Sequence, residues 1–295
     1  DQPCKISGIH KINKTITFKD KVLVQPGTKI FLNKGVDLIF KSSVIFNGSK
    51  TKPIKITGNE SGGIIVINES PLTSIFKNVK VYNLQSTKST LRKYTGAING
   101  YGGKFIIKNL EITGCLSEDQ INISEAEIDV KDLYIKNAIS DAFDCDFCNG
   151  KIQNFHFENI SGDGLDVSKS NLYVQNLKGV NVKDKALSVG EKSKLNLSNA
   201  YFQSVGTGVA VKDSSKVNLS DINIKNVIHD AFMTYVKKPF FKGETSLKVQ
   251  NFHDYSEVTE NVCIREPNTY LSINKVECVS SEVSVTKLYK GRMKK

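Results

Sequence analysis

Apolar residues recur along this chain at a fixed interval of about 22 residues. Around them, short runs such as KIQNFHF and NLYVQNL alternate apolar with polar residues, which is typical of β-strands with one buried face. The recurring positions have Asp or Gly just upstream, and they are Ile121, Phe143, Leu165, Leu187, Val209 and Phe232. A repeat of this length predicts a chain wound into stacked coils, in which residues one period apart become neighbours about 4.8 Å apart.

Two further columns carry Asn, Asp or Ser at the same interval. The first consists of Asn109, Asp132, Asn154, Asn176, Asn199 and Asp221, and the second of Asn137, Asn159, Asn181, Ser204 and Asn226. Asn and Asp tolerate left-handed backbone and hydrogen-bond to nearby backbone through their side chains. We expect both columns to be structural ladders at the corners of the coils.

The repeat favours one elongated domain over residues 1–295. Residues 1–30 are expected to form an N-terminal cap, 96–235 the most regular coils, and 246–295 the final coils with an exit cap, because a solenoid must cover both of its ends. No stretch shows sustained helical periodicity, and no apolar run is long enough for a membrane span.

The formal net charge is +11, from 41 Lys and Arg against 30 Asp and Glu. Such an excess favours an anionic partner, and we expect an acidic polysaccharide. Nucleic acid is not expected, because the basic residues are dispersed and no recognition motif is present. The first residue is Asp1, which predicts a processed chain whose export signal has been removed, and so a secreted, periplasmic or cell-surface protein. We expect it to be a monomer.

Six cysteines in a chain of 295 residues do not form a dense disulfide framework. Cys145 and Cys148 have CxxC spacing, but Cys145 falls in the column of Val167 and Val189, so it is interpreted as a small buried hydrophobe. Cys263 and Cys278 are candidates for a bridge near the C-terminal end.

Alternation along the strands predicts which side chains point away from the coils. If Phe143 and Leu165 point inward, Asp144, Asp146 and Asp166 point outward on two adjacent coils. These carboxylates are hard oxygen ligands of the kind that Ca²⁺ prefers, so they are candidate metal ligands and Ca²⁺ a candidate cofactor. A solvated acidic face is the alternative interpretation.

A second set of Asp residues precedes the same strands. Asp141, Asp163 and Asp230 are expected to cap backbone amides at turns.

Basic residues beside the acidic patch are candidate catalytic bases, in the order Lys185, Lys183 and His229. A lysine acts as a base only if its pKa falls, which a bound cation favours and free carboxylates oppose. The candidates for contacting substrate are Ser188, Lys212, Tyr235 and Lys237.

The motifs SDAFDCDF, SGDGLDVSKS and DKALSVGEKS, with the period and the Asn columns, make the chain similar to the right-handed parallel β-helix superfamily, the pectin-lyase-like fold. The resemblance covers about residues 20–285. It implies an all-β, single-stranded, right-handed parallel β-helix with about 22 residues per coil. Most characterised members act on polysaccharides as lyases, hydrolases or C5-epimerases, and others are adhesins or tailspikes.

Three functions follow as alternatives. The first is a lyase or C5-epimerase acting on uronate residues of an acidic polysaccharide, with a cation that neutralises the uronate carboxylate and a base that removes the α-proton. The second is a non-catalytic glycan-binding or cell-surface module. The third is a hydrolase with Asp144 and Asp166 as acid and base, although the chain lacks the Gly-His-Gly and Arg-Ile-Lys motifs of polygalacturonases.

Overall fold

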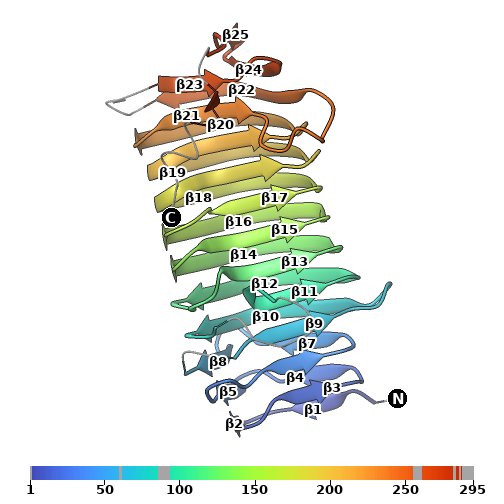
Figure 1. Cartoon of the computed structure of the whole chain (residues 1–295). Coiled ribbons are helices and arrows are strands. Elements are labelled where there is room, and N and C mark those ends of the chain that lie inside the picture. Colours follow the sequence, from blue (N-terminus) through green and yellow to red (C-terminus); the bar gives the residue numbers. More distant parts are fainter. Residues whose placement is uncertain are drawn as a thin grey trace.

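The structure is a computed structural model that describes residues 2–59, 62–85, 94–254, 261–281, 284–285 and 287. Parallel strands stack along one axis, from β1 at one end to β24 at the other (Figure 1). Among the described residues, the strand pairs are parallel except for β24 with β25. The parallel β-helix expected from the sequence is therefore confirmed.

The strands are β1 (Cys4–Ile6), β2 (Ile9–Ile12), β3 (Ile16–Phe18), β4 (Val22–Val24), β5 (Lys29–Leu32), β6 (Leu38–Phe40), β7 (Val44–Asn47), β8 (Ile54–Gly58), β9 (Ile64–Ile67), β10 (Thr73–Tyr82), β11 (Gly96–Tyr101), β12 (Lys104–Thr113), β13 (Asp119–Ser124), β14 (Glu127–Ala138), β15 (Asp141–Asp146), β16 (Asn149–Ile160), β17 (Leu165–Ser168), β18 (Asn171–Gly190), β19 (Lys194–Lys212), β20 (Lys216–Val227), β21 (Asp230–Tyr235), β22 (Thr245–Asp254), β23 (Asn261–Arg265), β24 (Thr269–Ile273) and β25 (Val276–Glu277).

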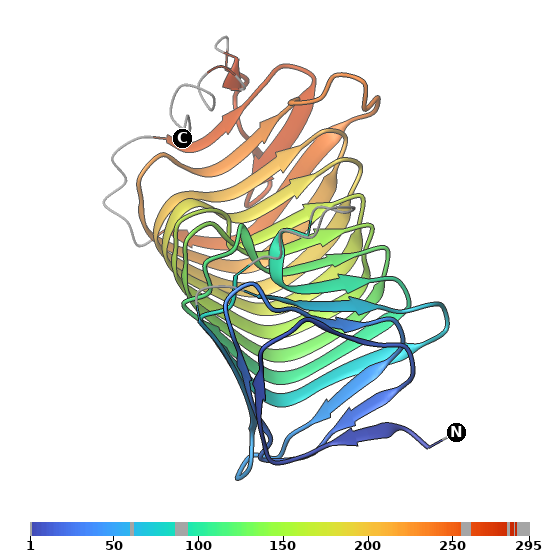
Figure 2. The ribbon, with the colours of Figure 1, turned by 60° about the horizontal axis from the view of Figure 1, so that its bottom comes forward.

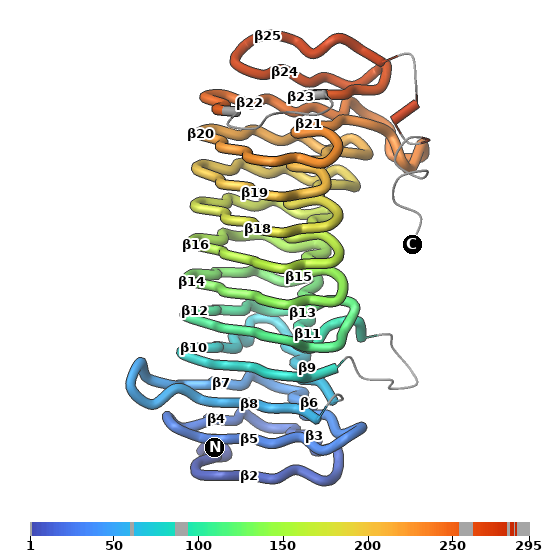
Figure 3. Tube along the Cα trace, turned by 90° about the vertical axis from the view of Figure 1, so that its left-hand side faces the viewer, coloured from blue at the N-terminus to red at the C-terminus, as the bar shows by residue number. Residues whose placement is uncertain are grey.

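Two outer faces of the stack matter for function. The first, which we call the carboxylate face, is the outward side of β11, β13, β15, β17, the C-terminal parts of β18 and β19, and β21. The second, which we call the amide face, is the outward side of the N-terminal parts of β16, β18, β19, β20 and β22. Figure 3 shows successive coils stacked one above another, and Figure 2 shows them from nearer the axis, so each face is a set of aligned rungs.

The recurring apolar residues form the interior column. Phe143 pairs in register with Leu165, Leu165 with Leu187, and Leu187 with Val209, and these side chains are fully buried. Burying apolar surface stabilises each coil only against its neighbours, so the stack depends on keeping this register. The predicted column is confirmed.

The first Asn column is a hydrogen-bonded ladder at the corner after the amide face. Asn176 donates from Nδ2 to Asn154 Oδ1 at 2.8 Å, and Asn199 donates to Asn176 Oδ1 at 2.8 Å. The backbone at these residues has φ between 56° and 60°, the left-handed region that Asn tolerates better than most residues. The second column is bonded in the same way between Asn159 and Asn137. Both predicted ladders are confirmed.

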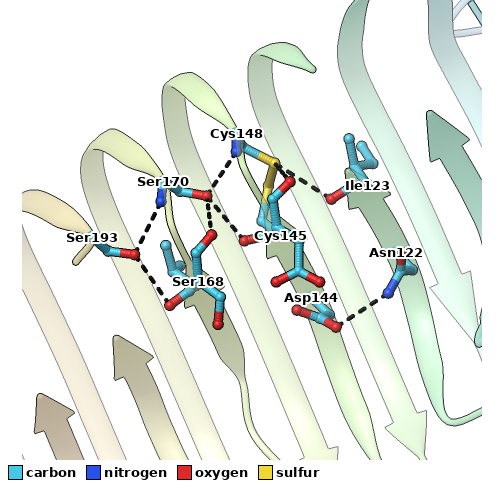
Figure 4. The surroundings of a disulfide bond; sticks show 10 residues. Asn122, Ile123, Asp144, Cys145, Cys148, Ser168, Ser170 and Ser193 are labelled. Carbon is cyan, nitrogen blue, oxygen red and sulfur yellow. Dashed lines mark hydrogen bonds between the residues drawn. A yellow bond between two sulfur atoms is a disulfide. The ribbon is translucent and has the colours of Figure 1, made fainter. Parts of the chain in front are cut away.

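The corner between the two faces carries a third ladder that the sequence analysis did not identify. The amide of Cys148 donates to Ser170 Oγ at 2.7 Å, and that of Ser170 to Ser193 Oγ at 3.0 Å. Ser193 repeats the contact with Ser215 at 3.1 Å. Hydroxyl groups therefore satisfy backbone amides where the strand ladder is interrupted (Figure 4).

The two ends of the solenoid differ. Strands β1, β2 and β3 already pair with β4, β5 and β6, so the first coil lies within the segment expected to be a cap. At the other end, β25 turns back on β24, and the predicted Cys263–Cys278 disulfide links this segment to β23. No helix in the described part of the chain is long and apolar enough to cross a membrane.

Candidate active site

A column of polar side chains crosses four successive coils of the carboxylate face. Asn122 pairs in register with Asp144, Asp144 with Asp166, and Asp166 with Ser188. Asn122 donates from Nδ2 to Asp144 Oδ2 at 3.1 Å, and also to Asp119 Oδ2 at 3.1 Å. Adjacent rungs thus bring the two predicted catalytic carboxylates together.

A hollow of about 300 Å³ adjoins this column on its N-terminal side. Asp144 and Asp146 line it together with Asn99, Tyr101 and residues of the neighbouring loop. Both carboxylates are partly exposed. A ligand in this hollow would contact Asp144 and Asp146, two of the three carboxylates of the predicted patch.

Lys212 approaches the column from the C-terminal side. It lies across Gly190, where a Cβ atom would come within 2.8 Å of Lys212 Cε, so the missing side chain makes room for it. The ammonium group donates to Ser188 Oγ at 2.8 Å, and the whole residue is only 7% exposed. The sequence predicted that Lys212 and Ser188 contact substrate. Both are buried, and both act on Asp166 instead, lowering its pKa.

Asp144 and Asp166 have pKa values shifted in opposite directions. Burial raises the pKa of Asp144 well above its usual value, and repulsion from Asp166 raises it further. Burial also acts to raise the pKa of Asp166, but the ammonium groups of Lys212 and Lys185 and a hydrogen bond from Ser188 outweigh it, so that pKa is lowered. One carboxyl group therefore retains a proton at a pH where its neighbour is ionised, the arrangement that assigns acid and base roles.

Two of the predicted caps, Asp141 and Asp163, accept hydrogen bonds from backbone amides, as expected. The amide of Asp163 donates to Asp141 Oδ1 at 2.7 Å, and the amide of Lys185 donates to Asp163 Oδ1 at 3.0 Å. Lys185 Nζ lies 2.9 Å from Asp163 Oδ1 and 2.7 Å from Asp184 Oδ1, and the residue is 2% exposed. The ammonium group is enclosed and contacts two carboxylates of the protein, so this geometry opposes the role of Lys185 as a base acting on a substrate.

One set of carboxylate oxygens is close enough to hold a metal ion. Oxygens of Asp141, Asp163 and Asp166 lie within 4.8 Å of one another, and this set shares only Asp166 with the predicted ligands. Burial raises the pKa of Asp141 to about 7 and that of Asp163 to about 6. The Lys185 ammonium already contacts Asp163, and three carboxylate oxygens close together are not in themselves evidence of Ca²⁺.

Of the remaining predicted residues, Lys237 is near enough to Asp166 for its charge to help lower the pKa of that carboxyl group. Lys183 and Lys237 are exposed and His229 is partly buried. Tyr235 is fully buried, although the sequence predicted that it points outward to contact substrate. Its face of the sheet is covered by the C-terminal segment, because Tyr235 packs in one apolar cluster with Ala210, Met233, Ile264 and Val285. The carboxylate face is therefore closed at this end.

Cys145 and Cys148 form a disulfide, so the interpretation of Cys145 as an unbonded buried residue was wrong. Both residues are fully buried. Asp144 and Asp146 flank Cys145 in the sequence, and Figure 4 shows Asp144 beside the disulfide. The bond joins the end of β15 to the start of the next strand and so restrains the rung that carries both carboxylates. The CxxC spacing was the available signal.

Models of known protein families give no match to the chain, and no curated protein is significantly similar to it. Among solved structures, it is similar to the catalytic domain of a GH87 α-1,3-glucanase, with 11% identity and a TM-score of 0.46, over 90% of this chain and 62% of that one. A GH136 lacto-N-biosidase from Eubacterium ramulus gives 11% identity and a TM-score of 0.39, over 88% and 62%. An alginate lyase from Paenibacillus sp. str. FPU-7 gives 12% and 0.31, over 83% and 93%. The chain thus spans about three-fifths of the length of the first two.

Proposed function

We propose that this protein hydrolyses glycosidic bonds of a polysaccharide on its carboxylate face. The observation that carries the proposal is the pair Asp144 and Asp166, in register on adjacent rungs with oppositely shifted pKa values. The hollow beside Asp144 is where the sugar chain would lie. Paired carboxyl groups of this kind are the usual apparatus of glycoside hydrolysis.

Each carboxyl group has a separate role in this mechanism. Asp144 donates its proton to the glycosidic oxygen as the bond from that oxygen to the anomeric carbon breaks. Asp166, ionised beside Lys212, stabilises the positive charge that develops on the sugar and accepts a proton from the attacking water. The hydroxyl of that water becomes the new anomeric hydroxyl, so atoms and charges balance.

The substrate class and compartment follow from charge and cysteine chemistry. A net charge of +11 attracts polyanions, which favours an acidic polysaccharide. The disulfides Cys145–Cys148 and Cys263–Cys278 fit a protein that works outside a reducing cytosol, as a secreted, periplasmic or cell-surface protein.

A lyase or C5-epimerase is the second candidate. The exposed Lys237, whose charge acts on Asp166, favours it, because positive charge near the site would neutralise a uronate carboxylate and acidify the adjacent proton. Lys183 or His229 would then have to approach the substrate as the base. If Ca²⁺ takes part, Asp144, Asp146 and Asp166 or the closer set with Asp141 and Asp163 would hold it.

Product analysis separates these functions. The protein is incubated with alginate, polygalacturonate and neutral glucans, and we expect new reducing ends without products that absorb in the ultraviolet. Unsaturated products would indicate a lyase, solvent deuterium at C5 an epimerase, and loss of activity with chelator a metal. Absence of any product, with binding retained, would indicate a binding module.

Substitution tests the assignment of the two carboxyl groups. Asp144→Asn and Asp166→Asn should each lower kcat by about 10² to 10⁴-fold, the usual contribution of a general acid or base. Asp20→Asn, at an exposed position in the N-terminal coils, is the matched control and should retain activity. Full activity in either site variant would contradict the mechanism.

A further inference from the structure

A second hollow, larger than the one beside Asp144, lies on the amide face. Its volume is about 520 Å³, and it extends over five strands from β16 to β22. Figure 3 shows these strands as successive layers of the stack. None of the residues that line it belongs to the carboxylate site described above.

Side-chain length creates this hollow. On the two central rungs, β19 and β20, the outward residues that line it are short: Asn196, Ser198, Asn218 and Ser220. On the flanking rungs the same register positions carry longer residues, Tyr173 and Gln175 on β18, and Lys248 and Gln250 on β22. A floor of small polar groups thus lies between two taller walls.

The amide groups of this groove are held in fixed orientations. Asn218 donates from Nδ2 to Asn196 Oδ1 at 3.0 Å, and Gln153 donates from Nε2 to Gln175 Oε1 at 3.2 Å. A primary amide has two donor hydrogens and an oxygen with two lone pairs, and each of these contacts uses one donor or one lone pair. The floor and one wall therefore present donors and acceptors side by side, which is the pattern that matches sugar hydroxyls.

Tyr173 supplies an apolar surface at the edge of the groove. Its side chain is 63% exposed, unusually high for a large ring on an ordered strand. An exposed aromatic face packs well against the C–H face of a sugar ring, while the phenol oxygen can still hydrogen-bond to water or ligand.

Charge and length identify the ligand class. The two charged residues of the lining, Lys151 and Lys248, are both cations and lie on its first and last rungs. Four steps between five stacked rungs span about 19 Å, at about 4.8 Å per step, so the groove suits an extended chain rather than a single sugar. Lys151 keeps a partly exposed ion pair with Asp129 at 3.7 Å, which screening makes weak.

We propose that this groove is a second, non-catalytic binding site for a linear acidic polysaccharide that lies along the solenoid axis. The site goes beyond the proposed hydrolysis because it occupies a different face and needs neither Asp144 nor Asp166. It would hold polymer on the protein while another segment of polymer is processed on the carboxylate face.

Binding is tested on the Asp144→Asn/Asp166→Asn double variant, so that turnover cannot remove the ligand. The probes are alginate and neutral dextran, and dissociation constants are measured by titration calorimetry. We expect alginate to bind more tightly than dextran. Adding Tyr173→Ala or Lys248→Ala should weaken alginate binding by about tenfold.

Matched controls separate the groove from general surface effects. Phe240→Ala removes a ring that is 73% exposed and lies outside the groove, and Lys225→Ala removes an exposed lysine from another face. Both control variants should bind alginate as tightly as the parent. Circular dichroism should show that all the variants are folded. Unchanged binding in the groove variants, equal losses in the controls, or equal affinity for dextran would overturn the proposal. Binding is measured on a variant that cannot turn over substrate. A failure of the groove proposal can therefore be distinguished from a failure of the hydrolase proposal.

Discussion

At the scale of single residues, the surroundings of each Asp determine whether its protonated or its ionised form is favoured. Asp141 is the clearest example, since burial and the neighbouring Asp163 raise its pKa from 3.8 to about 7. Between these two values the folded protein keeps a proton that the unfolded chain has already lost. The stability that Asp141 contributes is therefore highest at low pH and falls as the pH rises through this window.

Replacing this carboxyl group gives a pH-dependent prediction. Asp141→Asn keeps an oxygen to accept from the Asp163 amide but cannot ionise, so at pH 8 the variant should be more stable than the parent by at least about 1 kcal/mol, given that one pKa unit is worth about 1.4 kcal/mol. Near pH 4 the difference should disappear. Urea unfolding at both pH values measures it, and a difference independent of pH would refute the argument.

At the scale of the element, the unit of this protein is one coil, and its corners are set by backbone conformation as much as by hydrogen bonds. Asn176 has φ 57° and both donates to Asn154 and accepts from Asn199. For most L-residues this left-handed conformation is about 1–2 kcal/mol less favourable than the right-handed one, whereas Gly adopts it without this cost.

Two substitutions at this corner separate the conformational cost from the hydrogen bonds. Asn176→Gly should lose only the ladder contacts, while Asn176→Ala should lose the same contacts and also strain the corner. We expect Ala to be less stable than Gly by about 1 kcal/mol in chemical denaturation. Equal stabilities would show that the left-handed conformation is not retained in the Ala variant or carries no cost.

The coils were predictable from the sequence because their signals are periodic and local. An inward column such as Phe143 and Leu165 repeats in every period, and the Asn corners repeat with it. The CxxC bond was less predictable, because Cys145 also fits the column of Val167 and only the geometry of the corner brings Cys148 within reach.

The candidate site was predictable only in part, for a physical reason. Register alone placed Asp144 beside Asp166, since outward positions follow from alternation. Tyr235 is buried because Val285, which lies in a segment outside the repeat, packs against it. The ion pairs of Lys185 depend on the conformation of its long side chain at the edge of the strand. Neither effect has a periodic signature.

At the scale of the whole molecule, a basic protein carries a local concentration of carboxylates. The net charge of +11 acts over distances comparable to the Debye length, about 10 Å at 0.1 M salt. The half-buried Asp166 and the buried Lys212 are screened much less. Salt should therefore affect capture of the polymer more than its conversion.

This difference can be measured in the wild-type protein. Raising NaCl from about 0.05 M to about 0.5 M should raise KM for an acidic polysaccharide several-fold and leave kcat nearly unchanged, because long-range attraction acts on association. A neutral substrate should show little change in either constant. A fall in kcat with constant KM would place the salt effect at the catalytic pair instead.

The ladder of Asn side chains also bears on how such a protein changes over generations. Each Asn of the ladder donates a hydrogen bond to the previous rung and accepts one from the next. A duplicated stretch of one period would therefore form the same hydrogen bonds with the coils on both sides of it. A coil can in this way be gained or lost without redesign of the others. The catalytic proposal depends on the consecutive rungs that carry Asn122, Asp144, Asp166, Ser188 and Lys212. The number of coils before and after these rungs can therefore change while the chemistry stays the same.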